Sequence, residues 1–471
     1  MEQLFKKIDS HQDAFIALLK EAVAIKSVSA DAAYRDEVFR MTSWTAEKLK
    51  EIGTKVELIE NGQQTLPDGN QIKLPPVLFG QLGNDRSKKT LCVYGHLDVQ
   101  PASKSDGWNT EPFELTVKDG KMHGRGSTDD KGPVLAWVNA IKTMQELKIE
   151  IPVNIKFVFE GMEESGSEGL VEILTKHKDG FLGDVDATCI SDNYWLGRNK
   201  PCLTYGLRGV CYYFVEVSNP KQDLHSGIYG GALHEPMNSL VKLLGTLTKT
   251  DGTINIDGLY DLVAPLKPGE DELYQKIDFD TEDFRKNIDA NSLTTSDKAE
   301  LLKKTWRMPS LSIHGIQGAF HEPGSKTVIP CKVTGKFSIR IVPNMTPEKV
   351  HQLVQQHIEK EWQKLQSDCN IKIQPAQGNL PWVADFNNSL YKAGARAQEK
   401  VFGVSPDYTR EGCSIPITLT FQELTGKNVM LLPIGACDDM AHSQNEKMNI
   451  SNYMNGIKTL AAFLMELNEA L

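Results

Sequence analysis

The stretch Thr90-Leu-Cys-Val-Tyr-Gly-His-Leu-Asp98 gives the clearest indication of how this chain folds. Its first five residues are a short apolar run bounded by turn residues, which is typical of a strand buried on both faces. Further strand patterns cover 153–159 and 187–191, and helical patterns cover 133–144 and 170–177. Strands that alternate with helices in this way predict an α/β domain with a mostly parallel sheet.

The pattern changes between residues 207 and 384. The expected elements there are strands at 210–217, 332–341 and 370–374 and helices at 236–247 and 346–365. This order resembles a split β-α-β unit, so we predict a smaller α+β domain at 207–384 that interrupts an α/β domain made of 1–206 and 385–471. A charged stretch from about Lys267 to Lys304 is expected to be helical and exposed.

Composition excludes several classes of protein. The chain has 471 residues, 40% of them hydrophobic, which is enough for a large core without disulfides. Its net charge of −10 and its lack of a basic block argue against nucleic-acid binding. No apolar run is long enough for a membrane span, so we expect no membrane association of that kind. The eight cysteines are scattered, without a C-x-x-C pair, which favours reduced thiols and a cytoplasmic location.

Histidine and acidic residues follow several of the predicted strands. His96 and Asp98 are two residues apart in an extended segment, so they point to the same side. A histidine beside a carboxylate suits a metal ligand whose ring is oriented by the acid. A loop histidine next to a surface aspartate would show the same pattern, and this alternative stays open for the pair alone.

Two pairs of adjacent acids have the same ambiguity. Asp129 and Asp130 precede a predicted helix, where they could simply cap its N-terminus. Glu163 and Glu164 follow the strand at 153–159. Paired carboxylates at the end of a buried strand are costly unless a cation lies beside them.

The metal hypothesis rests on the coincidence of five such segments at strand ends of one sheet. They contribute His96, Asp129, Glu164, Asp192 and His442. Two imidazoles and three carboxylates suit two borderline divalent ions that share one bridging carboxylate, rather than magnesium or calcium sites made only of oxygen. Three carboxylates and one hydroxide would also balance the charge of two such ions.

Around these residues the sequence resembles the M20 metallopeptidase family over essentially its whole length. The segments YGHLDVQPA at 94–102, GRGSTDDKGP at 124–133 and EGMEESGSEGL at 160–170 carry the resemblance to the family as a whole. ISDNYWLG at 190–197 and SIPITLTFQ at 414–422 are narrower and are similar to a dipeptidase branch. The resemblance implies a di-metal peptidase domain and an inserted lid and dimerisation domain.

The resemblance implies that all five candidate ligands bind metal. Asp129 would bridge two divalent ions per chain, Mn or Zn. His96 with Asp192 would complete one site, and Glu164 with His442 the other. Two ions held in this way activate a water molecule and polarise the carbonyl of the bond to be cleaved.

Further roles near the ligands also come from the resemblance. Asp98 would orient His96, and Glu163 would be the general base that takes a proton from water and delivers it to the leaving amine. The peptide bond between Asp129 and Asp130 would be cis.

The resemblance assigns substrate binding to residues of both predicted domains. His225 would reach the active site of the partner subunit, in a homodimer formed through the inserted domain, and support the oxyanion there as a catalytic residue; its alternative is a loop histidine that caps local backbone. Thr327, Arg340 and Ser414 would hold the carboxyl end of the substrate. For Arg340 a structural ion pair is the alternative. Gln377 stands where relatives have a substrate-contacting histidine.

Two other positions depart from the family. Cys413 and Met440 both stand where relatives have glycine. Cys413 is next to Ser414, and Met440 is two residues from His442. Neither change removes a metal ligand or the base, so they bear on substrate preference rather than on reaction type.

The function implied is metal-dependent hydrolysis of dipeptides that have a free C-terminal carboxylate, such as Cys-Gly. An M20 deacylase of N-acyl amino acids is one alternative. A non-catalytic binding subunit that keeps the fold is another, and the presence of Glu163 and all five ligands argues against it.

Overall fold

The computed structural model describes residues 1–471 except 67, 377, 468–469 and 471. Its largest sheet follows the order β1-β4-β8-β5-β9-β19-β10-β17, with β18 paired to β10. The strands are β1 Lys55–Ile59, β4 Val77–Leu82, β5 Thr90–His96, β8 Asn154–Glu160, β9 Ala187–Ile190, β10 Cys202–Leu207, β17 Trp382–Val383, β18 Asp407–Glu411 and β19 Asn428–Leu431. The neighbours β8, β5, β9 and β19 run parallel, which confirms the predicted α/β fold.

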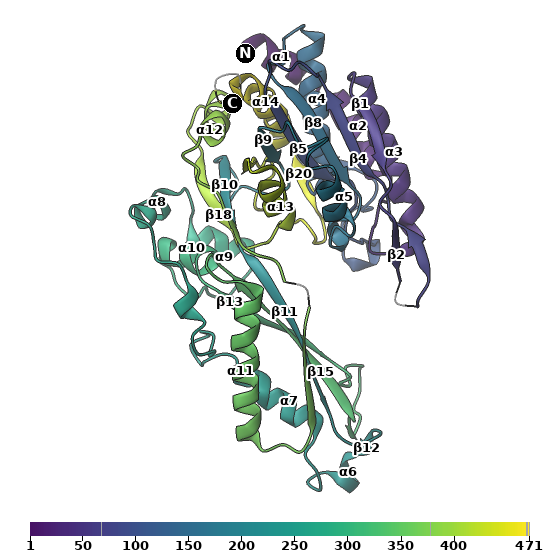
Figure 1. The fold of residues 1–471 in the computed structure, drawn as a ribbon, viewed down its shortest axis with the longest axis vertical. Coiled ribbons are helices and arrows are strands. Elements are labelled where there is room, and N and C mark those ends of the chain that lie inside the picture. Colours follow the sequence, from purple (N-terminus) through teal and green to yellow (C-terminus); the bar gives the residue numbers. More distant parts are fainter. Residues whose placement is uncertain (67, 377, 468–469, 471) are drawn as a thin grey trace.

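Helices cover both faces of this sheet (Figure 1). Successive strand residues point to opposite faces, so Leu91 and Val93 of β5 enter one core while Cys92 and Tyr94 enter another. The first core is packed by α1 Glu2–Ser10, α2 Gln12–Val23, α3 Arg35–Glu51, α4 Lys131–Glu146, α12 Ser389–Phe402 and α14 Ile450–Glu466. The second is packed by α5 Leu170–Lys176 and α13 Pro416–Thr425. Every residue of β5 is therefore buried.

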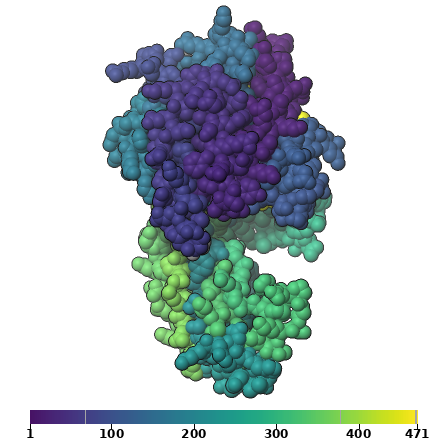
Figure 2. All heavy atoms as spheres, turned by 90° about the vertical axis from the view of Figure 1, so that its right-hand side faces the viewer, coloured from purple at the N-terminus to yellow at the C-terminus, as the bar shows by residue number. Residues whose placement is uncertain are grey.

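A separate antiparallel sheet forms the lower part of Figure 1. Its order is β13-β15-β11-β16, from β13 Ser310–Gln317, β15 Lys332–Ile341, β11 Gly209–Ser218 and β16 Asn370–Pro375. Burial alternates along β11 because one face packs on α7 Pro236–Gly245 and α11 Pro347–Leu365. Figure 2 shows the segments of this sheet as a lobe below the N-terminal segments. This part is the α+β insert that the sequence predicts.

The segment from Lys267 to Lys304 is helical, as expected, but it is not simply exposed. It contains α8 Glu270–Lys276, α9 Thr281–Asn287 and α10 Lys298–Trp306, whose side chains Tyr274, Leu302 and Trp306 form a small core of their own. The unit lies against β18 of the large sheet. The segment has many charged residues, so its few apolar residues, which pack against one another, were not recognised from the sequence.

The remaining elements are short. They are η1 Ala32–Tyr34, η2 Lys104–Asp106, η3 Glu163–Ser165, η4 Tyr260–Leu262, α6 Ser226–Tyr229, β2 Gln63–Thr65, β3 Gln71–Lys73, β6 Thr116–Lys118, β7 Lys121–His123, β12 Leu224–His225, β14 Val328–Ile329 and β20 Lys447–Asn449. Among the described residues, no helix is both long and apolar enough to cross a membrane.

Candidate metal centre and substrate cavity

Asp129 lies at the centre of the predicted metal site. Its Oδ1 is 3.0 Å from Nε2 of His96, at the end of β5, and its Oδ2 is 3.0 Å from Nε2 of His442. His442 comes from the loop after β19 and has a left-handed backbone with φ 60°. One carboxylate therefore faces two imidazoles, each with a separate oxygen.

A second carboxylate approaches each imidazole. Oδ1 of Asp192, just after β9, is 3.5 Å from His96 Nε2, and Oε2 of Glu164, just after β8, is 3.0 Å from His442 Nε2. Ligand atoms of His96, Asp129 and Glu164 all lie within 4.8 Å of one another. The structure thus brings the five predicted ligands together. His96, Glu164 and Asp192 lie at or just after parallel strands whose C-terminal ends share one edge of the large sheet. The expectation that all five follow strands of one sheet is wrong for Asp129, which comes from the loop between β7 and α4.

Asp98 connects this cluster to the predicted base. Its two carboxylate oxygens accept hydrogen bonds from the backbone N–H groups of Glu163 and Glu164, at 3.2 and 3.1 Å. Nδ1 of His96 is 3.5 Å from the Asp98 carboxylate but only 3.0 Å from the Asp98 carbonyl oxygen. The ring is therefore held by the backbone as well as the side chain of Asp98, and the same acid positions both glutamates.

The electrostatics of the cluster are those of a buried anionic site. Burial opposes protonation of His96, but Asp192, Asp129 and Asp98 raise its pKa well above the usual range. Burial raises the pKa of Asp192 to about 7. Hydrogen bonds to Asp129 and Glu164 raise the pKa of His442 to about 11. The carboxylates therefore attract positive charge strongly.

Glu163 has a different environment from Glu164. It lines the open cavity beside Asp129 and Asp192, whereas Glu164 makes its close contact with His442. Burial raises the pKa of Glu163 well above its usual range; the charge of His96 opposes this shift, and the charges of Asp192 and Glu164 add to it. A carboxylate with a raised pKa is a stronger proton acceptor, which is the property required of a general base.

Two buried acids far along the chain hold the loop that carries Asp129. Glu446 accepts hydrogen bonds from the backbone N–H groups of residues 126, 128 and 129, and it pairs with Arg125 at 2.7 Å. Asp439 accepts one from the hydroxyl of Thr128 at 2.8 Å. Sequence reasoning missed both acids, since no local pattern signals a partner more than 300 residues away.

Asp130 also lies in the cluster, although the sequence did not assign it a role as a metal ligand. Its Oδ2 accepts a hydrogen bond from the backbone N–H of His96 at 3.1 Å. The carboxylate approaches so closely that a Cβ at position 95 would be 2.7 Å from this oxygen, which explains glycine there. The Asp129–Asp130 peptide bond is cis, as the resemblance implies.

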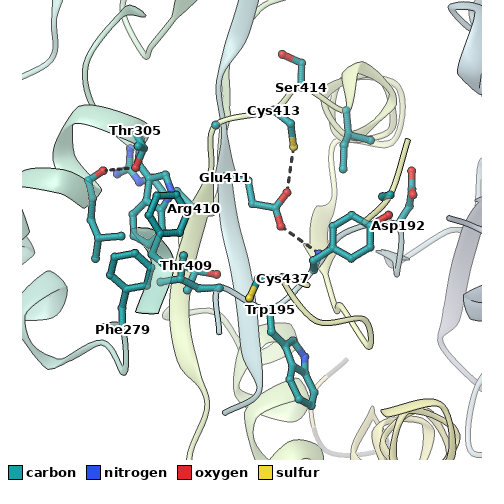
Figure 3. Close-up of a pocket in the computed structure, with 18 of the residues that line it drawn as sticks. Asp192, Trp195, Phe279, Thr305, Thr409, Arg410, Glu411, Cys413, Ser414 and Cys437 are labelled. Atoms are coloured by element: carbon teal, nitrogen blue, oxygen red, sulfur yellow. Dashed lines mark hydrogen bonds between the residues drawn. The ribbon is translucent and has the colours of Figure 1, made fainter. Parts of the chain in front are cut away.

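A cavity of about 480 Å³ opens from the metal cluster (Figure 3). Asp129, Glu163, Asp192 and His442 lie on its wall, and Ser414 lines it as well. The hydroxyl of Ser414 accepts a hydrogen bond from Nη1 of Arg340 at 3.0 Å. Two of the residues predicted to hold the substrate carboxylate are therefore in contact beside the cavity.

Cys413 and Glu411 also line the cavity. The Cys413 thiol donates to Oε2 of Glu411 at 3.0 Å, while Asn193 Nδ2 donates to the other oxygen at 2.9 Å (Figure 3). Glu411 is thus a half-buried carboxylate in the cavity, held by two donors, and another group that sequence reasoning did not single out. Met440 is exposed and has a left-handed backbone, φ 57°, a conformation for which glycine is better suited.

His225 and Thr327 lie in a different place from the cluster. His225 is the last residue of β12, which pairs with β14, and both strands lie at the far end of the insert from the large sheet (Figure 1). The carbonyl of Thr327 accepts a hydrogen bond from Ser226 N, so the two predicted residues are neighbours. Nδ1 of His225 accepts a hydrogen bond from Gly227 N at 3.0 Å. Gln377 lies outside the described residues.

The donor set fits divalent metal ions. Histidine nitrogens and carboxylate oxygens are borderline and hard ligands, a mixture that suits zinc or manganese. The carboxylates of Asp98, Asp129, Glu163, Glu164 and Asp192 outnumber the two imidazoles around them. Buried carboxylates in such excess need cations, and no lysine or arginine side chain pairs with these five in the described residues. Fold and donor set together define a metal-dependent hydrolase.

Comparison with known proteins gives the family. The model of Peptidase family M20/M25/M40 matches residues 92–466. A Beta-Ala-His dipeptidase of Rattus norvegicus is 50% identical over 471 residues, 100% of this chain and 96% of the relative. A Cys-Gly metallodipeptidase of Schizosaccharomyces pombe is 46% identical over 468 residues, which are 99% of this chain and 98% of the relative. Human carnosine dipeptidase 1 has a TM-score of 0.93 at 48% identity and covers 99% of this chain and 98% of its own. The chain belongs to the M20/M25/M40 peptidase family.

Proposed function

We propose that this chain hydrolyses dipeptides with a free C-terminal carboxylate, Cys-Gly among them, in a metal-dependent reaction. The observation that carries the proposal is the position of Asp129, which offers one oxygen to His96 and the other to His442 inside an open cavity. The full-length relatives named as dipeptidases support the reaction class.

The proposal includes two divalent ions per chain, Mn or Zn, held on the five ligands. His96 and Asp192 would bind one ion, Glu164 and His442 the other, and Asp129 both. When bound, ions of this kind acidify an attacking water and polarise the carbonyl of the scissile bond. Asp98 fixes the imidazole of His96 and the backbone of the glutamates, so the ligands need little rearrangement.

Glu163 is the proposed general base. It accepts the proton of the attacking water on its carboxylate and passes it to the amine that leaves. The adjacent Glu164 is held by His442 and by Gln100 Nε2, at 3.0 and 2.8 Å, so the two glutamates have separate tasks.

Arg340 and Ser414 are proposed to bind the substrate carboxylate. A guanidinium presents two parallel N–H donors that match a carboxylate, and the Ser414 hydroxyl lies 3.0 Å from one of its nitrogens. This arrangement selects substrates with a free C-terminus.

Assembly, domain division and location form the rest of the proposal. The chain would divide into a catalytic domain of residues 1–206 and 385–471 and a lid and dimerisation domain of residues 207–384. His225 and Thr327 would then act in trans on a partner subunit. All eight cysteines are free, among them the exposed Cys413 and Cys437, which favours a reducing compartment such as the cytoplasm.

The test is an assay of the protein loaded with Mn or Zn on Cys-Gly and on N-acetyl amino acids. The proposal predicts rapid release of glycine from Cys-Gly, slow deacylation, and loss of both after chelation. Preferential deacylation would make the chain an M20 deacylase, and no hydrolysis of either substrate would make it a binding subunit.

A further inference from the structure

Two arginines lie together where the insert joins the large sheet. Arg208 follows β10, and Arg340 belongs to β15 of the insert. The hydroxyl of Ser414 connects them, since it accepts a hydrogen bond from Nη1 of Arg340 at 3.0 Å and donates one to the carbonyl of Arg208 at 2.6 Å. Nη1 of Arg208 also donates to the hydroxyl of Ser310 at 2.9 Å, and Ser310 stands directly opposite Arg340 in the pairing of β13 with β15. Residues opposite each other in this way share one face of a sheet, so the two guanidinium groups are neighbours.

The recorded partners of both arginines are neutral. Arg208 donates from Nε to the carbonyl of Gly412 at 3.0 Å and from Nη1 to the carbonyl of Met308 at 3.3 Å. Arg340 donates to the Ser414 hydroxyl. Both side chains are half-buried, and in the described part of the chain neither forms an ion pair with a carboxylate. Burial, and then the charge of Arg340, lowers the pKa of Arg208 to about 10. Two adjacent positive charges of this kind are stabilised by a bound anion.

Glu411, a carboxylate of the same cavity, is engaged elsewhere. Its oxygens accept hydrogen bonds from Asn193 Nδ2 at 2.9 Å, from the backbone N–H of Tyr194 at 3.2 Å and from the Cys413 thiol at 3.0 Å (Figure 3). Burial raises its pKa above the usual range, which opposes its negative charge. The arginine pair is thus left without a counterion from this side chain.

Arg208 has a donor beside the cavity. Its Nη2 packs on Gly412, where a Cβ would be 2.7 Å from this nitrogen, so no side chain fits at position 412. Gly412 and Ser414 both line the cavity. No hydrogen bond occupies Nη2 among the residues that the structure describes. The N–H groups of this nitrogen are therefore available next to the place proposed for the carboxylate end of the substrate.

The chemistry of the C-terminal residue follows from the number of arginines. An α-carboxylate held by Arg340 and Ser414 brings one negative charge to two guanidinium groups. A side-chain carboxylate of aspartate or glutamate branches from the same Cα atom, so it lies within a few bonds of the α-carboxylate. It can approach the neighbouring guanidinium of Arg208 while the α-carboxylate stays on Arg340.

We propose that Arg208 binds a second carboxylate, on the side chain of the C-terminal residue, and that the enzyme prefers dipeptides ending in glutamate or aspartate to those ending in the corresponding amides. The inference rests on the proposed dipeptidase function and adds a substrate class to it. Arginine suits this task because its planar guanidinium matches the two oxygens of a carboxylate.

The test compares Ala-Glu with Ala-Gln on the metal-loaded protein. The two dipeptides have nearly the same shape and the same α-carboxylate, and they differ in the charge at the end of the second side chain. A hydrogen bond to a charged group contributes more than one between neutral groups, so kcat/KM for Ala-Glu should be about tenfold higher than for Ala-Gln. Equal or lower kcat/KM for Ala-Glu would overturn the proposal.

Variants assign the preference to Arg208. Arg208→Gln removes the charge and should bring the ratio of the two kcat/KM values close to one. Arg208→Lys keeps a charge but lacks the planar pair of donors, so it should lower the ratio part of the way. Arg396→Gln removes a half-buried arginine of α12 outside the cavity; it is the matched control and should keep the ratio. An unchanged ratio in either folded variant of Arg208 would overturn the proposal, even if the other failed to fold.

Failure of this inference is distinct from failure of the proposed function. Hydrolysis of Cys-Gly without preference for Ala-Glu over Ala-Gln leaves the dipeptidase function intact and refutes the second carboxylate site. No hydrolysis of any of the three dipeptides by metal-loaded protein refutes the function, and the second site with it.

Discussion

Glu446 accepts a hydrogen bond from the backbone N–H of Asp129 at 3.2 Å, although 317 residues separate the two. The same carboxylate pairs with Arg125, and both side chains are buried. Glu446, near the C-terminal end of the chain, therefore holds the loop that carries Asp129, the proposed shared metal ligand. The geometry of the centre depends on this contact as well as on the ligands themselves.

Glu446→Ala is expected to be strongly destabilising. It leaves the buried guanidinium of Arg125 unpaired, a change that costs about 3–5 kcal/mol in comparable buried pairs. Denaturant unfolding and metal content measure the effect, and Glu446→Gln, which retains an acceptor for the backbone N–H groups, should lose less of both. If Glu446→Ala unfolds at the same denaturant concentration as the unsubstituted protein, the contact does not hold the loop.

The adjacent glutamates should respond differently to the same substitution. Glu163→Gln is expected to keep the metal ions and lower kcat by roughly 10²–10⁴, the usual range for loss of a general base. Glu164→Gln should instead reduce metal occupancy. Elemental analysis and steady-state kinetics on both variants separate the two roles. Equal metal loss in the two variants would show that the division between them is wrong.

Metal affinity should rise with pH. Hydrogen bonds to Asp129 and Glu164 raise the pKa of His442 to about 11, and burial raises that of Asp192 to about 7. At pH 6 both groups are therefore protonated, and each must lose its proton to bind an ion; at pH 8 Asp192 has already lost its proton, while His442 and His96, whose pKa is also raised well above its usual range, must still release theirs. We expect affinity to increase about tenfold per pH unit for each proton released, with proton release detected by calorimetry in buffers of different ionisation enthalpy. Equal affinity at pH 6 and pH 8 would contradict the assigned ligands.

The sequence predicted the buried parallel strands of the large sheet better than the contacts between segments that are distant along the chain. Strands β5, β8 and β9 were recognisable because their apolar runs are buried on both faces, and their ends locate His96, Glu164 and Asp192. The structure confirms the fold class and brings the candidate ligands together. The roles of those residues stay predictions.

What the sequence did not predict depends on contacts between distant segments. Glu446 has no local pattern that points to Arg125, and Glu411 became part of the cavity only because β18 pairs with β10. The apolar residues of α9 and α10 that line the cavity were not recognised, because the many charged residues of this segment suggested an exposed one. Leu302 and Trp306 of α10 are buried in the small core of this segment and also line the cavity.

Assembly can be tested by complementation between subunits. His225 is far from the cluster of its own chain and caps Gly227 N in this structure, so a role in catalysis requires a partner. Mixed dimers of inactive His225→Ala and inactive Glu163→Ala chains contain one site with an intact Glu163 and an intact partner histidine. Random exchange makes about half of the dimers mixed, so about a quarter of full activity should return. Activity that stays at the level of the single variants after verified exchange would exclude action in trans.

The metal content of the active protein tests the central claim most directly. Asp129 offers one oxygen to each of two imidazole–carboxylate pairs, so elemental analysis should find two divalent ions per chain. Asp129→Asn should lose both ions together, while Asp192→Asn should lose one more readily than the other. A fully active protein with one ion or none per chain would contradict the account.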